Sequence, residues 1–131
     1  MIKGIGELLF LAVGALAGAF LRYKVVESPI VFGALPINVL TVNIIGSFVL
    51  GLFSVLSLIW NLDTKYSLLI AIGFCGSLTT MSSFALETTN LMDNKEFYAV
   101  ALNILLNVGL SLGAIYAGRI IASTIALQIG R

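Results

Sequence analysis

Residues 73–84 combine two glycines with five hydroxyl side chains inside an otherwise apolar run of the sequence. Backbone that leaves a regular helix at membrane depth persists only where protein or a water-filled cavity satisfies its polar groups. Half-helix ends inside a membrane commonly hold ions, with amide ends facing anions and carbonyl ends facing cations. The segment therefore predicts a helix that is broken near the bilayer midplane and forms part of an ion site.

Asparagine and serine side chains mark two further apolar runs. Asn43 could donate two N–H groups to an anion, or it could hydrogen-bond to a neighbouring helix that is broken. Asn103, Asn107 and Ser111 recur every four residues, which places them on one face of a helix. This uncharged stripe is typical either of the wall of an anion path or of contacts between helices.

Two charged residues are also candidates for a role in the site. Arg22 could extend toward the membrane surface, or it could raise the local anion concentration at a pore mouth. Glu87 follows the hydroxyl-rich segment, and we expect it to pair with a cation in a structural role rather than to line a vestibule.

The sequence contains no recognisable catalytic constellation. The chain has no histidine and a single cysteine, Cys75, so the commonest general base, thiolate metal clusters and internal disulfides are excluded. No nucleophile with a neighbouring base is readable from the sequence. The net charge is +1 without clustered basic residues, which argues against nucleic acid as a partner. We expect a permeation protein, not an enzyme.

Composition indicates which elements must position these residues. The chain has 131 residues, of which 60% are hydrophobic and 10% charged, as expected for an integral membrane protein. A helix needs about 20 apolar residues to cross a bilayer. Four segments qualify and form a single all-α membrane domain: residues 4–23, 36–60, 66–91 and 97–124.

The connections carry helix-start signals. Pro36 suits the first turn of the second helix, because a residue there needs no N–H donor. Asp63 or Thr64 is expected to cap the third helix.

Four spans place both chain ends on one side of the membrane, and basic residues are then nearly balanced between the sides. The terminal side has Lys3, Lys65, Arg119 and Arg131, and the other side has Arg22, Lys24 and Lys95. An excess of Lys and Arg normally fixes orientation. The near balance predicts insertion in both orientations and an antiparallel dimer, although one or two charges could still fix a single orientation. Two pairs of glycines four residues apart, in residues 14–18 and 109–113, suit close helix contact within the chain or between chains.

Three motifs together resemble the CrcB/Fluc family of fluoride channels. They are the glycine-rich residues 14–23 ending in Arg-Tyr, the Val-Asn-x-x-Gly motif within residues 40–48, and the hydroxyl-rich residues 73–84. The resemblance implies an antiparallel dual-topology homodimer with two fluoride pores. It also implies a structural Na⁺ between the broken third helices, held by the backbone carbonyls of Gly76 and Thr79 of each chain.

The same resemblance implies a set of fluoride-pathway residues. They are Asn43, Thr80, Met81, Ser82, Ser83, Phe84, Asn107 and Ser111, with Arg22 at the pore mouth. The family usually has two phenylalanines three residues apart in the third span, and here the first is Met81. A thioether lacks the positive ring edge of phenylalanine, so we expect conduction at an altered rate.

The resemblance favours a passive, fluoride-selective channel that exports fluoride across the cytoplasmic membrane. The alternative is a small dual-topology proton-coupled multidrug exporter. Such an exporter needs a carboxylate in the middle of its first span, whereas Glu7 lies too near the membrane edge. A membrane scaffold without transport would explain the small residues but not the hydroxyl-rich segment.

Overall fold

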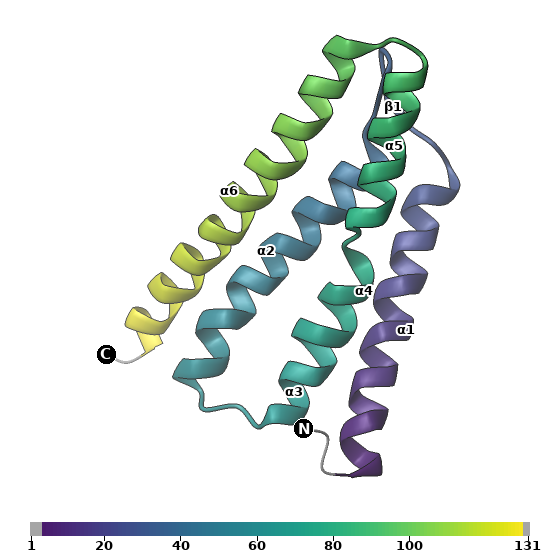
Figure 1. Ribbon diagram of the computed structural model, residues 1–131. Helices are drawn as coiled ribbons and strands as arrows, with labels where there is room; N and C mark the ends of the chain where they lie inside the picture. The colour runs from purple at the N-terminus through teal and green to yellow at the C-terminus, as the bar shows by residue number, and fades with distance from the viewer. Residues whose placement is uncertain (1–3, 130–131) are drawn as a thin grey trace.

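Four long helical segments run lengthwise through the molecule (Figure 1). The computed structural model describes residues 4–129. Within that range four segments are long and apolar enough to cross a membrane. They are α1 (Ile5–Glu27), α2 (Asn38–Ile59), a composite third span over Thr64–Asp93, and α6 (Phe97–Ile129). The chain thus has the elements of a multi-pass membrane protein, and α1 and α6 continue beyond residues 23 and 124, where the apolar runs suggested that they end.

The third span consists of four consecutive helical pieces. A short helix α3 (Thr64–Ser67) leads into the π-helix η1 (Leu68–Cys75), which is followed by the single turn α4 (Gly76–Leu78). The backbone is then extended at Thr79 and Thr80, with ψ angles of 152° and 116°, before helix α5 (Met81–Asp93) begins. The departure from helical backbone is therefore confined to two residues.

A small hairpin connects α1 to α2. Strand β1 (Val31–Phe32) pairs antiparallel with β2 (Leu35–Pro36), and Gly33 has a φ of +63°, which suits glycine at a tight turn. The prediction that Pro36 lies in the first turn of a helix was wrong, because Pro36 belongs to β2. The Ile37 N–H donates to the Ile30 carbonyl at 3.1 Å, which extends the hairpin pairing and delays the start of α2.

The start of the third span agrees with expectation. Asp63 is the N-cap residue of α3, and its side chain accepts a hydrogen bond of 3.0 Å from the Lys65 N–H. This bond satisfies one of the backbone donors that lack a partner at a helix start.

The long segments lie side by side in the order α6, α2, third span and α1 (Figure 1). Glycines permit the closest contacts. A Cβ at Gly51 would overlap the Ile115 carbonyl between α2 and α6, and one at Gly18 would overlap the Phe74 carbonyl between α1 and η1. The glycine pair of the first span therefore allows close helix packing within the chain.

The second glycine pair has a different environment. Among the described residues, a Cβ at Gly109 or Gly113 would meet nothing within 4 Å. Around them, apolar side chains such as Leu105, Leu112 and Tyr116 are exposed on α6, as expected for a surface covered by lipid or by a second chain. At these two positions α6 therefore has no close packing partner within residues 4–129.

The two ends of the molecule carry different connections. The start of α1, the α2–α3 connection and the end of α6 lie at one end, and the hairpin and the α5–α6 turn lie at the other (Figure 1). The basic residues Lys3 and Arg131, counted above for the terminal side, lie outside the described residues.

Candidate functional site

The non-helical pair Thr79–Thr80 forms the centre of the site. Thr80 is the N-cap of α5, and its hydroxyl accepts a 3.2 Å hydrogen bond from the Ser83 N–H. The Thr80 N–H does not continue a helix but donates to the Asn43 side-chain oxygen at 2.8 Å. Asn43 of α2 therefore holds the point at which the third span changes from helix to extended backbone.

These bonds leave two carbonyls without the amide donors that a continuous helix would give them. In such a helix the Thr80 N–H would donate to the Gly76 carbonyl, and the Ser83 N–H to the Thr79 carbonyl. Both N–H groups are engaged elsewhere, by Asn43 and by the Thr80 hydroxyl. Carbonyl oxygens of this kind are suitable ligands for a hard cation. The residues implied as Na⁺ ligands, Gly76 and Thr79, therefore fit that group chemically.

A cavity of about 410 Å³ opens beside this centre, and we call it the central cavity. It brings together most of the expected site residues: Asn43, Gly76, Thr79, Thr80, Met81, Phe84, Asn107 and Ser111. Met81 is 74% exposed there. The lining of the central cavity is mostly apolar, with amide and hydroxyl groups interspersed. No formally charged side chain is among the described lining residues.

A second cavity of about 450 Å³, here called the α1–α5 cavity, contains the remaining expected residues. It is lined by Ala19, Arg22, Tyr23, Val26, Glu27, Thr80, Ser82 and Ser83. Ser82 and Ser83 thus lie apart from the central cavity, and Thr80 is common to both. Thr80 also joins the hydroxyls, because its Oγ1 lies 3.1 Å from the Oγ atoms of Ser82 and Ser83.

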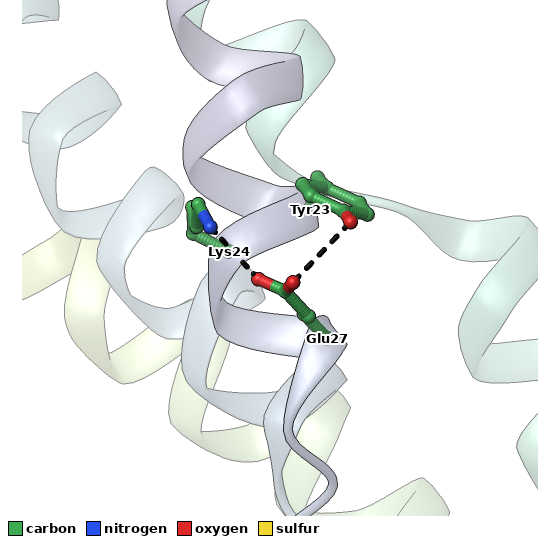
Figure 2. Close-up of polar contacts among 3 residues, drawn as sticks. All are labelled: Tyr23, Lys24 and Glu27. Carbon is green, nitrogen blue, oxygen red and sulfur yellow. Dashed lines mark hydrogen bonds and ion pairs between the residues drawn. The ribbon is translucent and has the colours of Figure 1, made fainter.

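The charged groups around the α1–α5 cavity are arranged by local pairing. Glu27 is engaged by Lys24 at 3.0 Å and accepts a 3.3 Å hydrogen bond from the Tyr23 hydroxyl (Figure 2). Lys24 offsets the Glu27 carboxylate, while Arg22 forms no ion pair with any described residue. Because Glu27 is paired with Lys24, Arg22 is the charged lining residue whose charge is not offset by an ion pair within residues 4–129, and its guanidinium favours anions.

The asparagines of α6 form hydrogen bonds that could not be predicted from their four-residue spacing alone. Asn43 donates to the Asn107 oxygen at 3.0 Å, and Asn107 donates to the Asn103 oxygen at 2.9 Å. Asn103, which is fully buried, donates to the Thr88 hydroxyl of α5 at 3.1 Å. The stripe thus connects α6 to both α2 and α5.

Two polar atoms near these groups are buried without a hydrogen-bond partner among residues 4–129. They are the Ser111 hydroxyl, in the central cavity, and one carboxylate oxygen of Glu87. A serine in a helix usually bonds back to a carbonyl of the preceding turn. Within residues 4–129 the Ser111 hydroxyl has no such partner, although Ser111 lines the central cavity. The cation partner expected for Glu87 is not present among the described residues.

Sequence reasoning did not single out Asn38 or Thr88. The buried Asn38 accepts from the Ile30 N–H at 2.6 Å and donates to the Ser28 carbonyl at 3.0 Å and to the Val25 carbonyl. It therefore fixes the corner between α1 and the hairpin. A signal was available, since an asparagine at the start of an apolar run is costly unless its amide is satisfied.

Comparison with known proteins identifies the family of this chain. Residues 9–119 match the family described as CrcB-like protein, Camphor Resistance (CrcB). The chain belongs to the CrcB-like family. This membership agrees with the resemblance of its three motifs to CrcB/Fluc proteins, and the CrcB-like match extends from α1 into α6.

Curated CrcB-like relatives match nearly the whole chain. One from Nitrosopumilus maritimus, named fluoride-specific ion channel FluC, is 60% identical over 124 residues, covering 95% of this chain and 98% of the relative. Proteins of the same name from Methanocaldococcus jannaschii and Methanococcus maripaludis are 45% and 43% identical. These alignments cover 92% and 87% of this chain, and 98% and 93% of the two relatives.

Proposed function

We propose that this protein is a fluoride-selective ion channel. The observation that carries the proposal is the 60% identity, over nearly the full length of both chains, to a protein named a fluoride-specific ion channel. The chemistry of the site supports it, because the central cavity combines hydroxyl side chains and uncharged amides with a non-helical segment of a membrane span.

The fluoride path runs through both cavities and changes from one to the other at Thr80. Arg22 concentrates anions at the mouth of the α1–α5 cavity, where Ser82 and Ser83 supply the first hydroxyls. Beyond Thr80, the ion meets the part of the central cavity formed by Met81, Phe84, Asn107 and Ser111, with Asn43 beside the break. Thr80 is the natural transfer point, because its hydroxyl already lies within hydrogen-bond distance of both serines.

Uncharged donors suit a channel for this ion. Fluoride is small and tightly hydrated, so the protein must replace the water around it with hydrogen-bond donors. A fixed cation deep in the path would bind the anion too strongly, whereas conduction requires both entry and exit. Hydroxyl groups and the positive ring edge of Phe84 give an intermediate attraction. Arg22 is the one basic side chain along the two described cavities, and it lies at the mouth.

Transport is passive and its direction is outward. Fluoride enters cells as the neutral acid HF and is trapped after it ionises. In the cytoplasmic membrane, a potential that is negative inside then drives the anion out. No P-loop occurs in the sequence, as expected for an uncoupled channel.

The working unit is an antiparallel homodimer with two pores and a structural Na⁺ at its centre. The central cavity opens on the same side as Gly76, which is exposed in the single chain. A second copy would cover this surface, and the Gly76 and Thr79 carbonyls of both chains would hold the ion. The bound Na⁺ would join the two broken third spans near the bilayer midplane.

A proton-coupled multidrug exporter is not favoured. Carboxylates are absent from the lining of the central cavity, and Glu7 lies in the first turn of α1, far along the helix from the Gly18 contact with the third span. A coupled exporter would need a proton-carrying group at its binding site.

Fluoride efflux from liposomes tests the proposal. The purified protein is reconstituted into vesicles loaded with potassium fluoride, and release is followed with a fluoride electrode after addition of a potassium ionophore. We expect rapid release that depends on the ionophore, because an uncoupled channel carries net charge. Vesicles loaded with potassium chloride should release little chloride, and protein-free vesicles set the leak. Equal release of both anions would exclude selectivity, and no release would exclude a homomeric channel.

A further inference from the structure

Five hydrogen bonds run from the break in the third span through α2 and the buried face of α6 to α5. The Thr80 N–H donates to Asn43, Asn43 to Asn107, Asn107 to Asn103, and Asn103 to the Thr88 hydroxyl, at distances of 2.8, 3.0, 2.9 and 3.1 Å. Thr88 then donates to the backbone carbonyl one turn earlier in α5, at 2.7 Å. Every donor points in the same direction along the series, so each bond polarises the next.

The amides at the cavity have no spare N–H group for an anion. Asn43 donates to the Thr80 carbonyl at 3.4 Å in addition to Asn107. Asn107 donates to both the backbone and the side-chain oxygen of Asn103, at 3.1 and 2.9 Å. Since a carboxamide has two N–H donors, the donors of Asn43 and Asn107 are already engaged. Their orientation is thus determined by the partners behind them.

The last two members of the series are remote from the path. Asn103 is fully buried and Thr88 half-buried, and neither contributes to the lining of the central or the α1–α5 cavity. Their polar groups are nevertheless directed into the series, where Asn103 both accepts from Asn107 and donates to Thr88. A purely structural bond between α5 and α6 would not need to continue through two more amides to the break.

We propose that Thr88 and Asn103 are positioning residues that set the orientation of the Asn43 amide, and through it the start of α5. We call Thr80, Asn43, Asn107, Asn103 and Thr88 the amide relay. The effect of the relay on transport rests on the proposed channel function, whereas its effect on Asn43 does not. In this arrangement Asn43 holds the broken span, and the hydroxyls of residues such as Ser111 contact the ion.

The amide relay can be interrupted at Thr88, the member farthest along the series from the break. Thr88→Val keeps the shape of the side chain but removes the hydroxyl, and Thr88→Ser restores that hydroxyl. Thr89→Val is the matched control, because Thr89 makes the same type of bond to the preceding turn, at 2.9 Å to Ala85, outside the relay. Two measurements are made on each full-length protein: the side-chain amide NMR signal of Asn43, identified by its loss in Asn43→Ser, and fluoride efflux from liposomes.

We expect Thr88→Val to shift the Asn43 amide signal and to reduce efflux about fivefold, as for the loss of one hydrogen bond. Thr88→Ser should restore both, and Thr89→Val should leave both near wild type. If Thr88→Val resembles Thr89→Val in the NMR signal, the relay is wrong. If the signal shifts while efflux is unchanged, the proposed effect of the relay on transport is wrong. Failure of the wild-type protein to release fluoride would instead overturn the proposed function, and the NMR signal would still decide the relay.

Discussion

Met81 lies where the resemblance to CrcB/Fluc proteins implied a phenylalanine, and its side chain is 74% exposed beside the central cavity. The sulfur is polarizable, but it provides no ring edge with partial positive charge. Compared with phenylalanine, methionine retains an apolar side chain but lacks the positive ring edge. Position 81 therefore allows these two contributions to the proposed anion passage to be tested separately.

Met81→Phe should increase fluoride efflux, because it adds a second ring edge beside Phe84 in the central cavity. Aromatic contacts of this kind contribute about 1 kcal/mol, which corresponds to an increase of about fivefold if the contact favours the rate-limiting step. Met81→Leu is the control for shape and should remain near the wild-type rate. Initial efflux rates at equal protein density measure the effect. Equal rates for the Phe and Leu variants would show that the ring edge contributes nothing.

Ser111 offers a second test at the residue scale, because its buried hydroxyl has no partner in the described chain. Ser111→Ala removes a polar group whose burial is already unfavourable, so thermal stability in detergent should be equal to or slightly above wild type. Fluoride efflux should fall about fivefold or more if this hydroxyl replaces water around the ion. Ser54→Ala is a suitable comparison, since the Ser54 hydroxyl is satisfied by the Gly51 carbonyl at 2.8 Å. Loss of stability without loss of efflux would contradict the role in the path.

The elements were predictable to different extents, and the reasons are physical. Hydropathy indicated four spans, because a bilayer sets a minimum apolar length. The π-helix η1 could not be predicted, since Leu68–Cys75 is uniformly apolar and has no periodicity that would distinguish one helical hydrogen-bond pattern from another. Pro36 was misassigned because the same missing N–H is compatible with a helix start and with a strand edge. Only the partner of Ile37 across the hairpin decides between them.

The residue types of the site were predictable from the sequence, but the cavities and hydrogen bonds in which they take part were not. Residue types identified the amides and hydroxyls that line the two cavities, because polar groups in apolar spans need partners. The division of these residues between two cavities depends on where α1 packs against α5, which no local pattern records. Likewise, helical spacing aligned Asn103 with Asn107, but the link to Thr88 requires the turn between α5 and α6 to bring the two helices together.

The contact between α1 and η1 makes a prediction at the level of elements. Gly18→Ala should destabilise the protein by about 1–3 kcal/mol, because the added Cβ would overlap the Phe74 backbone carbonyl and force the helices apart. Gly6→Ala is the control on the same helix, where a Cβ would meet nothing within 4 Å. Thermal unfolding in detergent measures the difference. If both variants unfold at the same temperature, the close approach of α1 and η1 is wrong.

At the scale of the whole molecule, the uncovered surfaces and the distribution of basic residues bear on how the chain is oriented in the membrane. The central cavity opens beside the exposed Gly76, and a Cβ at Gly109 or Gly113 on α6 would meet nothing within 4 Å among residues 4–129. A second chain in the opposite orientation could cover such surfaces. Antiparallel pairing requires that the chain insert in both directions, and the near balance of four basic residues on one side against three on the other permits this.

Dual insertion can be measured with one cysteine added at either end of the molecule. Ser28→Cys lies between α1 and the hairpin, and Thr64→Cys lies at the start of α3; both positions are exposed. We expect a membrane-impermeant maleimide to label about half of each variant in intact cells, as for equal insertion in both directions. The wild-type protein gives the background, because its single cysteine, Cys75, is buried. Complete labelling of one reporter with none of the other would establish a single orientation.

The same reporters can show that charge controls orientation. Adding Asn94→Lys and Glu96→Lys at the α5–α6 turn raises the basic residues on the hairpin side from three to five, against four on the terminal side. Because the more basic side remains in the cytoplasm, the Ser28→Cys reporter should lose its labelling and the Thr64→Cys reporter should gain it. Asn94→Gln with Glu96→Gln alters the same positions without adding Lys and should leave labelling near half. If antiparallel dimers conduct, fluoride efflux should fall in the Lys variant alone and recover when a variant of opposite bias is co-expressed. Full efflux from a population with one orientation would instead show that conduction does not require antiparallel pairing.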